Sequence, residues 1–183
     1  AAMGLPVLED VNAPTNGEAI GYASRNIWKG RRQSAAVAFL APARHRRNLT
    51  IVTNAVCDTV ELDGKRVTGV NVIEGAQTRK IRGKEIVLCG GAMSTPGILE
   101  RSGIGDSSVL APLGIDLKHS LPNVGKHLVE HRALLMQWKV KDRRYSFNHV
   151  YHGWRLSFEI LRYIFTRRGP MTSATFDMGA WVK

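Results

Sequence analysis

Residues 91–105, with the run before them, constrain the fold of this 183-residue chain more than any other segment. The preceding run, residues 85–90, is rich in apolar residues and predicts a strand. Two adjacent glycines, Gly90 and Gly91, let the backbone turn sharply and approach a neighbour that a Cβ would exclude. Strand, glycine turn and helix in this order form the crossing that nucleotide-binding α/β proteins use.

The helix expected after this turn covers residues 96–102, and its ends carry suitable residue types. Thr95 or Ser94 can cap the N-terminus. Pro96 suits the first helical position, because its missing N–H costs nothing there. Gly103 supplies a left-handed stop.

Residues 49–89 predict a β-meander that leads into one central strand. The Asp63-Gly64 pair is a strong hairpin turn between two alternating runs. The expected strands are 49–53, which reads as buried, then 56–62, 66–73, 78–81 and the central strand 85–89. The other expected elements are a strand near 21–28, a helix over 34–40 capped by Ser34 and ended by Pro42, a helix over 107–113 between Asp106 and Gly114, and a helix over 154–165.

The chain carries 26 Lys and Arg against 15 Asp and Glu, a formal net charge of +11. The basic residues fall in small groups, mostly at the ends of expected elements. A nucleic-acid module instead concentrates its charge on one face and adds aromatic residues for stacking. We therefore expect a solvated surface and no nucleic-acid partner. A non-catalytic basic module that binds nucleic acid or another acidic partner stays as an alternative.

Cys57 and Cys89 are the only cysteines, and both lie in apolar, strand-like runs. We expect two buried thiols in a reducing cytoplasm rather than a disulfide. Neither has metal-ligating company at a suitable spacing, so we expect no metal site. No apolar run approaches the ~20 residues of a membrane helix, and no secretory signal is visible. The two thiols, expected to be reduced, predict a cytoplasmic location. Because the chain begins without Met, we also expect a fragment.

The letters GAMSTPGILERSGIG at residues 91–105 carry a family resemblance. They resemble the second motif of the glucose-methanol-choline (GMC) flavin oxidoreductases: a small-residue turn, Ser/Thr-Pro, two aliphatic residues and Ser-Gly-aliphatic-Gly. Further segments are similar to the family in the expected order, namely residues 30–36, 39–44, 48–53, 64–70, 121–131 and 168–171. The resemblance covers practically the whole chain and points to choline-dehydrogenase-like alcohol dehydrogenases.

This resemblance implies an α/β fold that is α+β in part. It would be the central portion of an FAD-binding nucleotide fold with a β-meander, plus parts of an antiparallel-sheet substrate domain. Residues 30–133 would belong to the FAD-binding domain, and residues 1–29 and 134–183 to the substrate domain. The implied cofactor is FAD. The implied activity is that of an FAD-dependent oxidoreductase acting on the CH–OH group of an alcohol, with hydride passing to the flavin.

The resemblance also implies where FAD lies. In the family, the segment matching residues 55–58 runs beside the adenine, and the backbone position that reads the base edge falls on Cys57. The alternative is a core cysteine on a buried strand. Cys89, Gly90, Gly91 and Ala92 match the small-residue segment that passes the cofactor, where a helix N-terminus favours negative charge. The alternative there is close strand–helix packing without a ligand.

We expect no catalytic residue in this chain. The family's base is a histidine beyond the matched region, and the Gly-x-Gly-x-x-Gly loop that holds a pyrophosphate is absent. His127 and His131 have a spacing that could bind metal on a helix. However, they lie in a segment that resembles a metal-free family motif, where His127 and Glu130 replace the usual Asn and Asp.

The chain is therefore expected to be the middle of a longer enzyme and inactive by itself. Its expected partners are a small-molecule alcohol and the rest of the parent polypeptide. A flavin-containing hydroxynitrile lyase of the same fold stays as an alternative.

Overall fold

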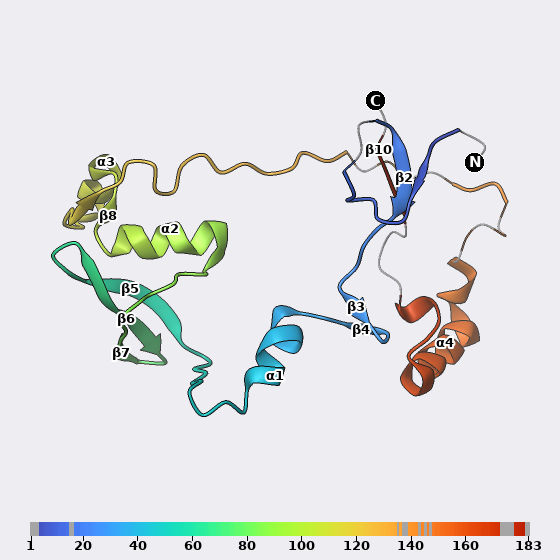
Figure 1. The fold of residues 1–183 in the computed structure, drawn as a ribbon, viewed down its shortest axis with the longest axis horizontal. Helices are drawn as coiled ribbons and strands as arrows, with labels where there is room; N and C mark the ends of the chain where they lie inside the picture. The colour runs from blue at the N-terminus through green and yellow to red at the C-terminus, as the bar shows by residue number, and fades with distance from the viewer. Residues whose placement is uncertain are drawn as a thin grey trace. The chain divides into compact units, whose positions relative to one another are not determined.

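The computed structural model describes residues 4–14, 17–134, 136, 139–142, 144, 146, 148–172 and 178–181 (Figure 1). The chain folds into two compact units. One unit combines Ala1–Leu49 with Met136–Lys183, and the other is continuous over Thr50–Leu135. The continuous unit is thus inserted, along the chain, between the two halves of the first.

The continuous unit is built on an antiparallel meander of β5 (Val56–Asp63), β6 (Arg66–Glu74) and β7 (Gln77–Arg82). Val60 pairs with Val70 across the first two strands, and Gly64 closes their turn at φ +56°. The three strands predicted over 56–62, 66–73 and 78–81 are confirmed. β5 also carries a bulge that was not predicted: Cys57 pairs with Val72 and Thr59 with Asn71, which leaves Asp58 out of the pairing.

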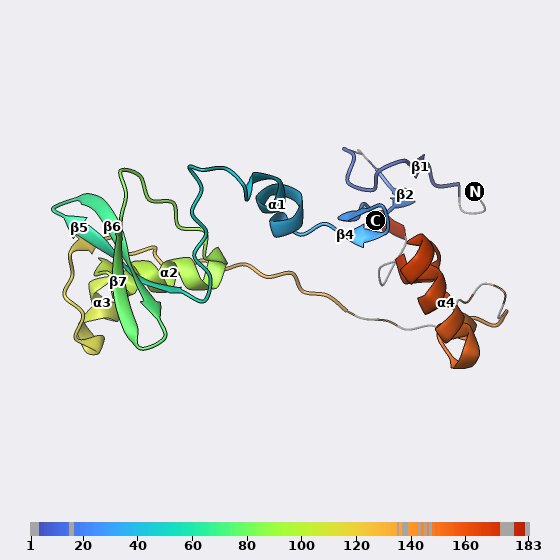
Figure 2. The same ribbon diagram turned by 90° about the horizontal axis from the view of Figure 1, so that it is seen from below.

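Helix α2 (Gly91–Arg101) follows the meander and lies against β5 (Figures 1 and 2). It begins five residues before the predicted start at residue 96, so Pro96 lies inside the helix instead of at its first position. The predicted stop is confirmed, because Gly103 adopts φ +83°. A Cβ on Gly103 would collide with the carbonyl oxygen of Asp116.

The helix predicted over 107–113 is confirmed as α3 (Ser107–Leu110) followed by the 3₁₀ turn η2 (Ala111–Leu113). Asp106 caps it by accepting the Ser108 N–H at 2.9 Å. Gly114 ends it in the left-handed conformation. The short strands β8 (Ile104–Gly105) and β9 (His119–Ser120) pair in parallel on either side of these turns.

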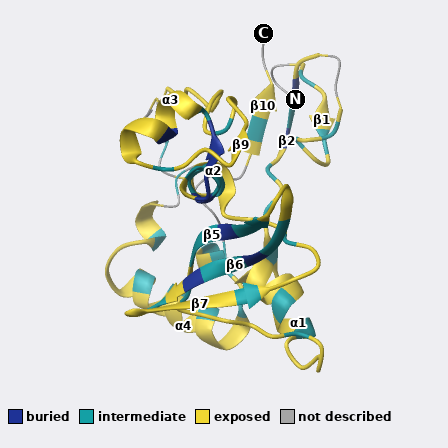
Figure 3. Ribbon diagram, turned by 90° about the vertical axis from the view of Figure 1, so that its left-hand side faces the viewer, coloured by how far each residue is buried: buried dark blue, intermediate teal, exposed yellow. Residues whose placement is uncertain are grey.

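The core of this unit lies between the sheet and α2 (Figure 3). Val60, Ile98 and Ile104 are at most 6% exposed and form its centre. Cys57 and Leu88 are partly buried and pack against the same three residues. The core therefore anchors β5 and the segment that leads into the glycine turn at one place.

In the other unit, β1 (Val7–Leu8), β2 (Ala19–Tyr22) and β10 (Met178–Trp181) form a sheet in the order β1-β2-β10. β1 runs parallel to β2, and β10 runs antiparallel to it. The Trp181 indole donates to the Val11 carbonyl at 2.8 Å. Segments from the two ends of the sequence thus fold together.

The same unit holds the hairpin β3 (Ile27–Trp28) and β4 (Arg31–Arg32), the turns η4 (Asn148–Val150) and η5 (Pro170–Thr172), and helix α4 (Gly153–Thr166). α4 confirms the helix predicted over 154–165. The single strand predicted near 21–28 is instead two strands, β2 and β3. The tract predicted as a helix ended by Pro42 is a π-helical turn, η1 (Ala36–Leu40), that continues through Pro42 in α1 (Ala41–Ala43). Ser34 Oγ accepts the Val37 N–H at 3.3 Å, as its predicted capping role requires.

Two predicted strands are wrong in this structure: residues 49–53 and 85–89 have no strand assignment. A central strand needs a neighbour on each side, and in the described ranges β5, β6 and β7 pair only with one another. Both segments keep apolar side chains in solvent, with Val52 42% and Val87 75% exposed. The prediction that Cys89 is buried is also wrong, because its thiol is exposed. Cys89 ends the 85–89 segment, which has no partner strand among the described residues to cover it.

Candidate cofactor-binding site

Cys57 lies on β5 beside the bulge, with its thiol half-buried against the core. Burial raises the pKa of this thiol, the nearby Asp58 carboxylate raises it further, and Arg101 opposes both. Cys57 is therefore a neutral thiol at physiological pH and fills the site as a small apolar side chain. This environment suits a role carried by the backbone, although contact with adenine stays a prediction.

The four residues predicted to pass the cofactor surround the start of α2. Cys89, Gly90, Gly91 and Ala92 are all exposed. Gly90 is the N-cap residue, and its N–H donates to Thr95 Oγ1 at 3.0 Å. Thr95 thus bonds back to the cap from inside the helix, whereas capping by Thr95 or Ser94 was predicted. The difference follows from the earlier helix start.

The N-terminus of α2 fits the nucleotide part of a cofactor such as FAD. Gly91 has φ +81°, and a Cβ built on it meets no atom within 4 Å, so the backbone is open to solvent. The first turn carries no acidic residue and no side-chain cap. Its free N–H groups and the positive end of the helix dipole are therefore open to a phosphate oxygen.

Three side chains that the sequence reasoning missed tie α2 to β5. Ser102 is 2% exposed; its Oγ accepts the Val60 N–H at 2.8 Å and donates to the Ile98 carbonyl at 2.6 Å. Arg101 Nε donates to the carboxylate of Asp58 at 2.8 Å and to its carbonyl at 3.2 Å. A small polar residue just before a helix-ending glycine was the only sequence signal for this arrangement.

The histidines form no candidate catalytic or metal centre in the described part of the chain. His127 and His131 lie in a segment without helical structure, so their spacing of four does not place them on one helix face. His127 has φ +60°, and the His131 N–H donates to the neighbouring Glu130 carboxylate at 2.7 Å. No group of three or more His, Cys, Asp or Glu side chains there could hold a metal ion.

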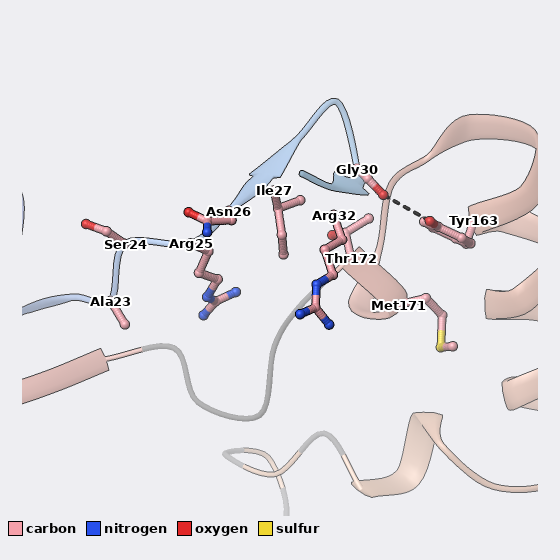
Figure 4. Close-up of a pocket in the computed structure, with 10 residues that line it drawn as sticks. All are labelled: Ala23, Ser24, Arg25, Asn26, Ile27, Gly30, Arg32, Tyr163, Met171 and Thr172. Carbon is pink, nitrogen blue, oxygen red and sulfur yellow. Dashed lines mark hydrogen bonds between the residues drawn. The ribbon is translucent and has the colours of Figure 1, made fainter. Parts of the chain in front are cut away.

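A pocket of about 580 Å³ lies in the unit formed from the two ends of the sequence (Figure 4). The β3–β4 hairpin faces α4 and η5 across it, and the Tyr163 hydroxyl donates to the Gly30 carbonyl at 3.0 Å. Its described lining contains two guanidinium groups, from Arg25 and Arg32, and no carboxylate, histidine or cysteine. Such a pocket can bind a small molecule, but its described lining offers no imidazole or carboxylate to act as a general base.

Among the described residues, no helix is long and apolar enough to cross a bilayer.

A sequence profile described as GMC oxidoreductase matches residues 1–133. The oxygen-dependent choline dehydrogenase of Chromohalobacter salexigens is 43% identical over 141 residues, which cover 76% of this chain and 25% of that protein. The enzyme of the same name from Staphylococcus aureus is 37% identical over 166 residues, or 91% of this chain and 29% of that protein. The chain thus spans between a quarter and a third of the length of these curated relatives.

Solved structures agree with this match. Pyridoxine 4-oxidase from Mesorbium loti aligns with a TM-score of 0.62 and 36% identity, over 67% of this chain and 24% of that one. An FAD-dependent oxidoreductase from Chaetomium thermophilum aligns with a TM-score of 0.86 and 23% identity, over 97% of this chain and 32% of that one. The second likeness bears on the fold alone, and it confirms the α/β class expected from the sequence.

Proposed function

Because this chain belongs to the GMC oxidoreductase family, we propose that it forms the central part of an FAD-dependent oxidoreductase acting on the CH–OH group of an alcohol. The match over residues 1–133 carries this proposal, and the two choline dehydrogenases at 43% and 37% identity favour a small alcohol as substrate. Bound FAD supplies the hydride acceptor. The histidine base lies outside this chain.

In this proposal the continuous unit holds the adenosine side of the cofactor. The backbone at Cys57 contacts the adenine edge, while the neutral thiol packs inward on the core. Cys89, Gly90, Gly91 and Ala92 expose backbone at the start of α2, and the helix N-terminus faces negative charge. Both contact points are anchored by one core, which supports placing them on the same ligand.

The two ends of the sequence supply part of the substrate domain in this proposal. Residues 1–29 and 134–183 are assigned to it, and residues 30–133 to the FAD-binding domain. Pairing of β2 with β10 joins the two end segments in one unit, which supports grouping those two segments together, although the same unit extends to Leu49. We also propose a cytoplasmic location, which the two free thiols favour.

The decisive experiment uses a full-length polypeptide that contains this chain. It should purify with a yellow chromophore that is released on denaturation and identified as FAD by chromatography. Anaerobic addition of choline or an aryl alcohol should bleach the flavin absorbance. Absence of flavin after reconstitution contradicts the proposal. Bound flavin that no alcohol bleaches points to the hydroxynitrile lyase alternative.

A further inference from the structure

The bulge in β5 lies where the cofactor is expected to approach. A bulge bends its strand and leaves one residue without ladder hydrogen bonds. Here that residue is Asp58, the immediate neighbour of Cys57. β5 is also an edge strand of its three-stranded sheet, so none of the described strands restrains the bulge from the other side. The geometry of the bulge therefore depends on the side chains that contact Asp58.

Arg101 is the group that holds it. The Nε–H is shared between the carbonyl oxygen of Asp58, at 3.2 Å, and one oxygen of its carboxylate, at 2.8 Å. A single guanidinium thus fixes both the backbone and the side chain of the bulged residue. The Arg101 and Asp58 side chains are 46% and 36% exposed, so the ion pair is exposed to solvent and contributes little to the stability of the fold. Its larger effect is geometric.

Arg101 is also the last residue of α2, and the first residues of that helix are the ones expected to face the nucleotide. At 1.5 Å per residue, the 11 residues of α2 form a rod about 16 Å long between the two places. Next to Arg101, Ser102 binds the Val60 N–H, two residues beyond the bulge. The C-terminal end of the rod is therefore attached to β5 at two points.

We propose that Asp58 and Arg101 are positioning residues that set where the Cys57 backbone lies relative to the Gly90–Gly91 turn, and thereby tune affinity for the adenosine half of FAD. This inference rests on the proposed function. The pair does not touch the reacting atoms. It keeps the bulge in the conformation that presents the neighbouring backbone, while α2 carries the second contact point at its other end.

The test compares Arg101→Ala with Arg79→Ala in the full-length polypeptide. Arg79 on β7 forms a surface ion pair with Glu74 on β6, at 2.6 Å and with the two side chains 51% and 37% exposed. Arg79 is in register with Val72, the partner of Cys57, but its ion pair does not involve β5, so it is a matched control for the loss of an exposed arginine ion pair. Apoprotein is titrated with FAD, the apoprotein melting temperature is measured, and flavin reduction by substrate is timed at saturating FAD. Arg101→Ala should raise the FAD dissociation constant about tenfold, while Arg79→Ala should change it less than about twofold.

If Arg101 is a positioning residue, Arg101→Ala should have the same melting temperature as Arg79→Ala. Substrate should reduce its bound flavin at the wild-type rate. Asp58→Asn, which keeps a carbonyl oxygen for Arg101 to bind, should retain most of the FAD affinity. An unchanged FAD affinity in Arg101→Ala overturns the inference. So does a loss of affinity accompanied by a melting temperature clearly below that of the control. If wild-type apoprotein binds no FAD, the proposed function itself fails, which is a separate and recognisable outcome.

Discussion

Replacing Ser102 by alanine should destabilise the continuous unit strongly for so small a change. The hydroxyl is buried at 2% exposure and is the partner of the Val60 N–H, which has no replacement once Oγ is removed. The Ile98 carbonyl loses less, because the Ser102 N–H still donates to it at 3.1 Å. An unsatisfied buried donor costs about 1–3 kcal/mol, so we expect about 2 kcal/mol of lost unfolding free energy.

Urea unfolding followed by circular dichroism measures this loss. With a slope of about 1–2 kcal/mol per molar, the midpoint should fall by about 1 M or more while the slope stays constant. Ser94→Ala is the matched control, since Ser94 is exposed on the same helix and should shift stability by less than about 0.5 kcal/mol. If Ser102→Ala and Ser94→Ala unfold at the same urea concentration, the buried hydrogen bond does not stabilise the unit and the reasoning is refuted.

Three further predictions concern flavin binding, acid stability and activity. In the full-length polypeptide, Cys57→Val should keep its flavin because volume and backbone are preserved. Cys57→Asp should lose its flavin, because it places an unpaired carboxylate against the core. Gly90→Val should lose its flavin because the added Cβ lies 3.2 Å from the N and Oγ1 of Thr95. The measurement is flavin content per folded protein, and full flavin in both variants contradicts the cofactor placement. Hydrogen bonds from Lys126 and Ser108 lower the pKa of Asp106 to about 2, so its stabilising effect should be complete above about pH 4 and fade as the pH falls towards 2. Asp106→Asn, which can still cap the helix, should flatten that part of an acid-denaturation curve, and an identical curve counts against the stabilising effect of the charged carboxylate. The 183-residue chain alone, given FAD, should not oxidise choline or aryl alcohols, and any turnover would show that the active site is misplaced.

Local signals in the sequence predicted the elements whose hydrogen-bond partners lie within a few residues along the chain. Alternation around Asp63-Gly64 is sufficient for the β5–β6 hairpin, because the strands pair with each other. Asp106 and Gly114 delimit α3 and η2 because each satisfies its own helix end. The family resemblance likewise depended on contiguous residues, and the profile match supports it.

Features that depend on distant partners were not predictable in this way. Residues 49–53 and 85–89 have strand composition, but a strand forms only when a neighbour pairs with it. The bulge at Asp58 adds one residue to the β5 side of the β5–β6 pairing, which a count of apolar positions does not detect. Arg101 and Ser102 meet β5 across 42 or 43 residues of chain, so their role becomes visible only in three dimensions.

The insertion of one unit within the other fixes an order of assembly during synthesis. All strands of the β5–β7 meander emerge from the ribosome within 27 residues of one another. β2, in contrast, can pair with β10 only after nearly the whole chain has been synthesised, since Ala19 pairs with Trp181. At about 5–20 residues per second, that wait lasts roughly 10–30 s. During this interval one edge of β2 has no partner, while the inserted unit already has every strand of its sheet.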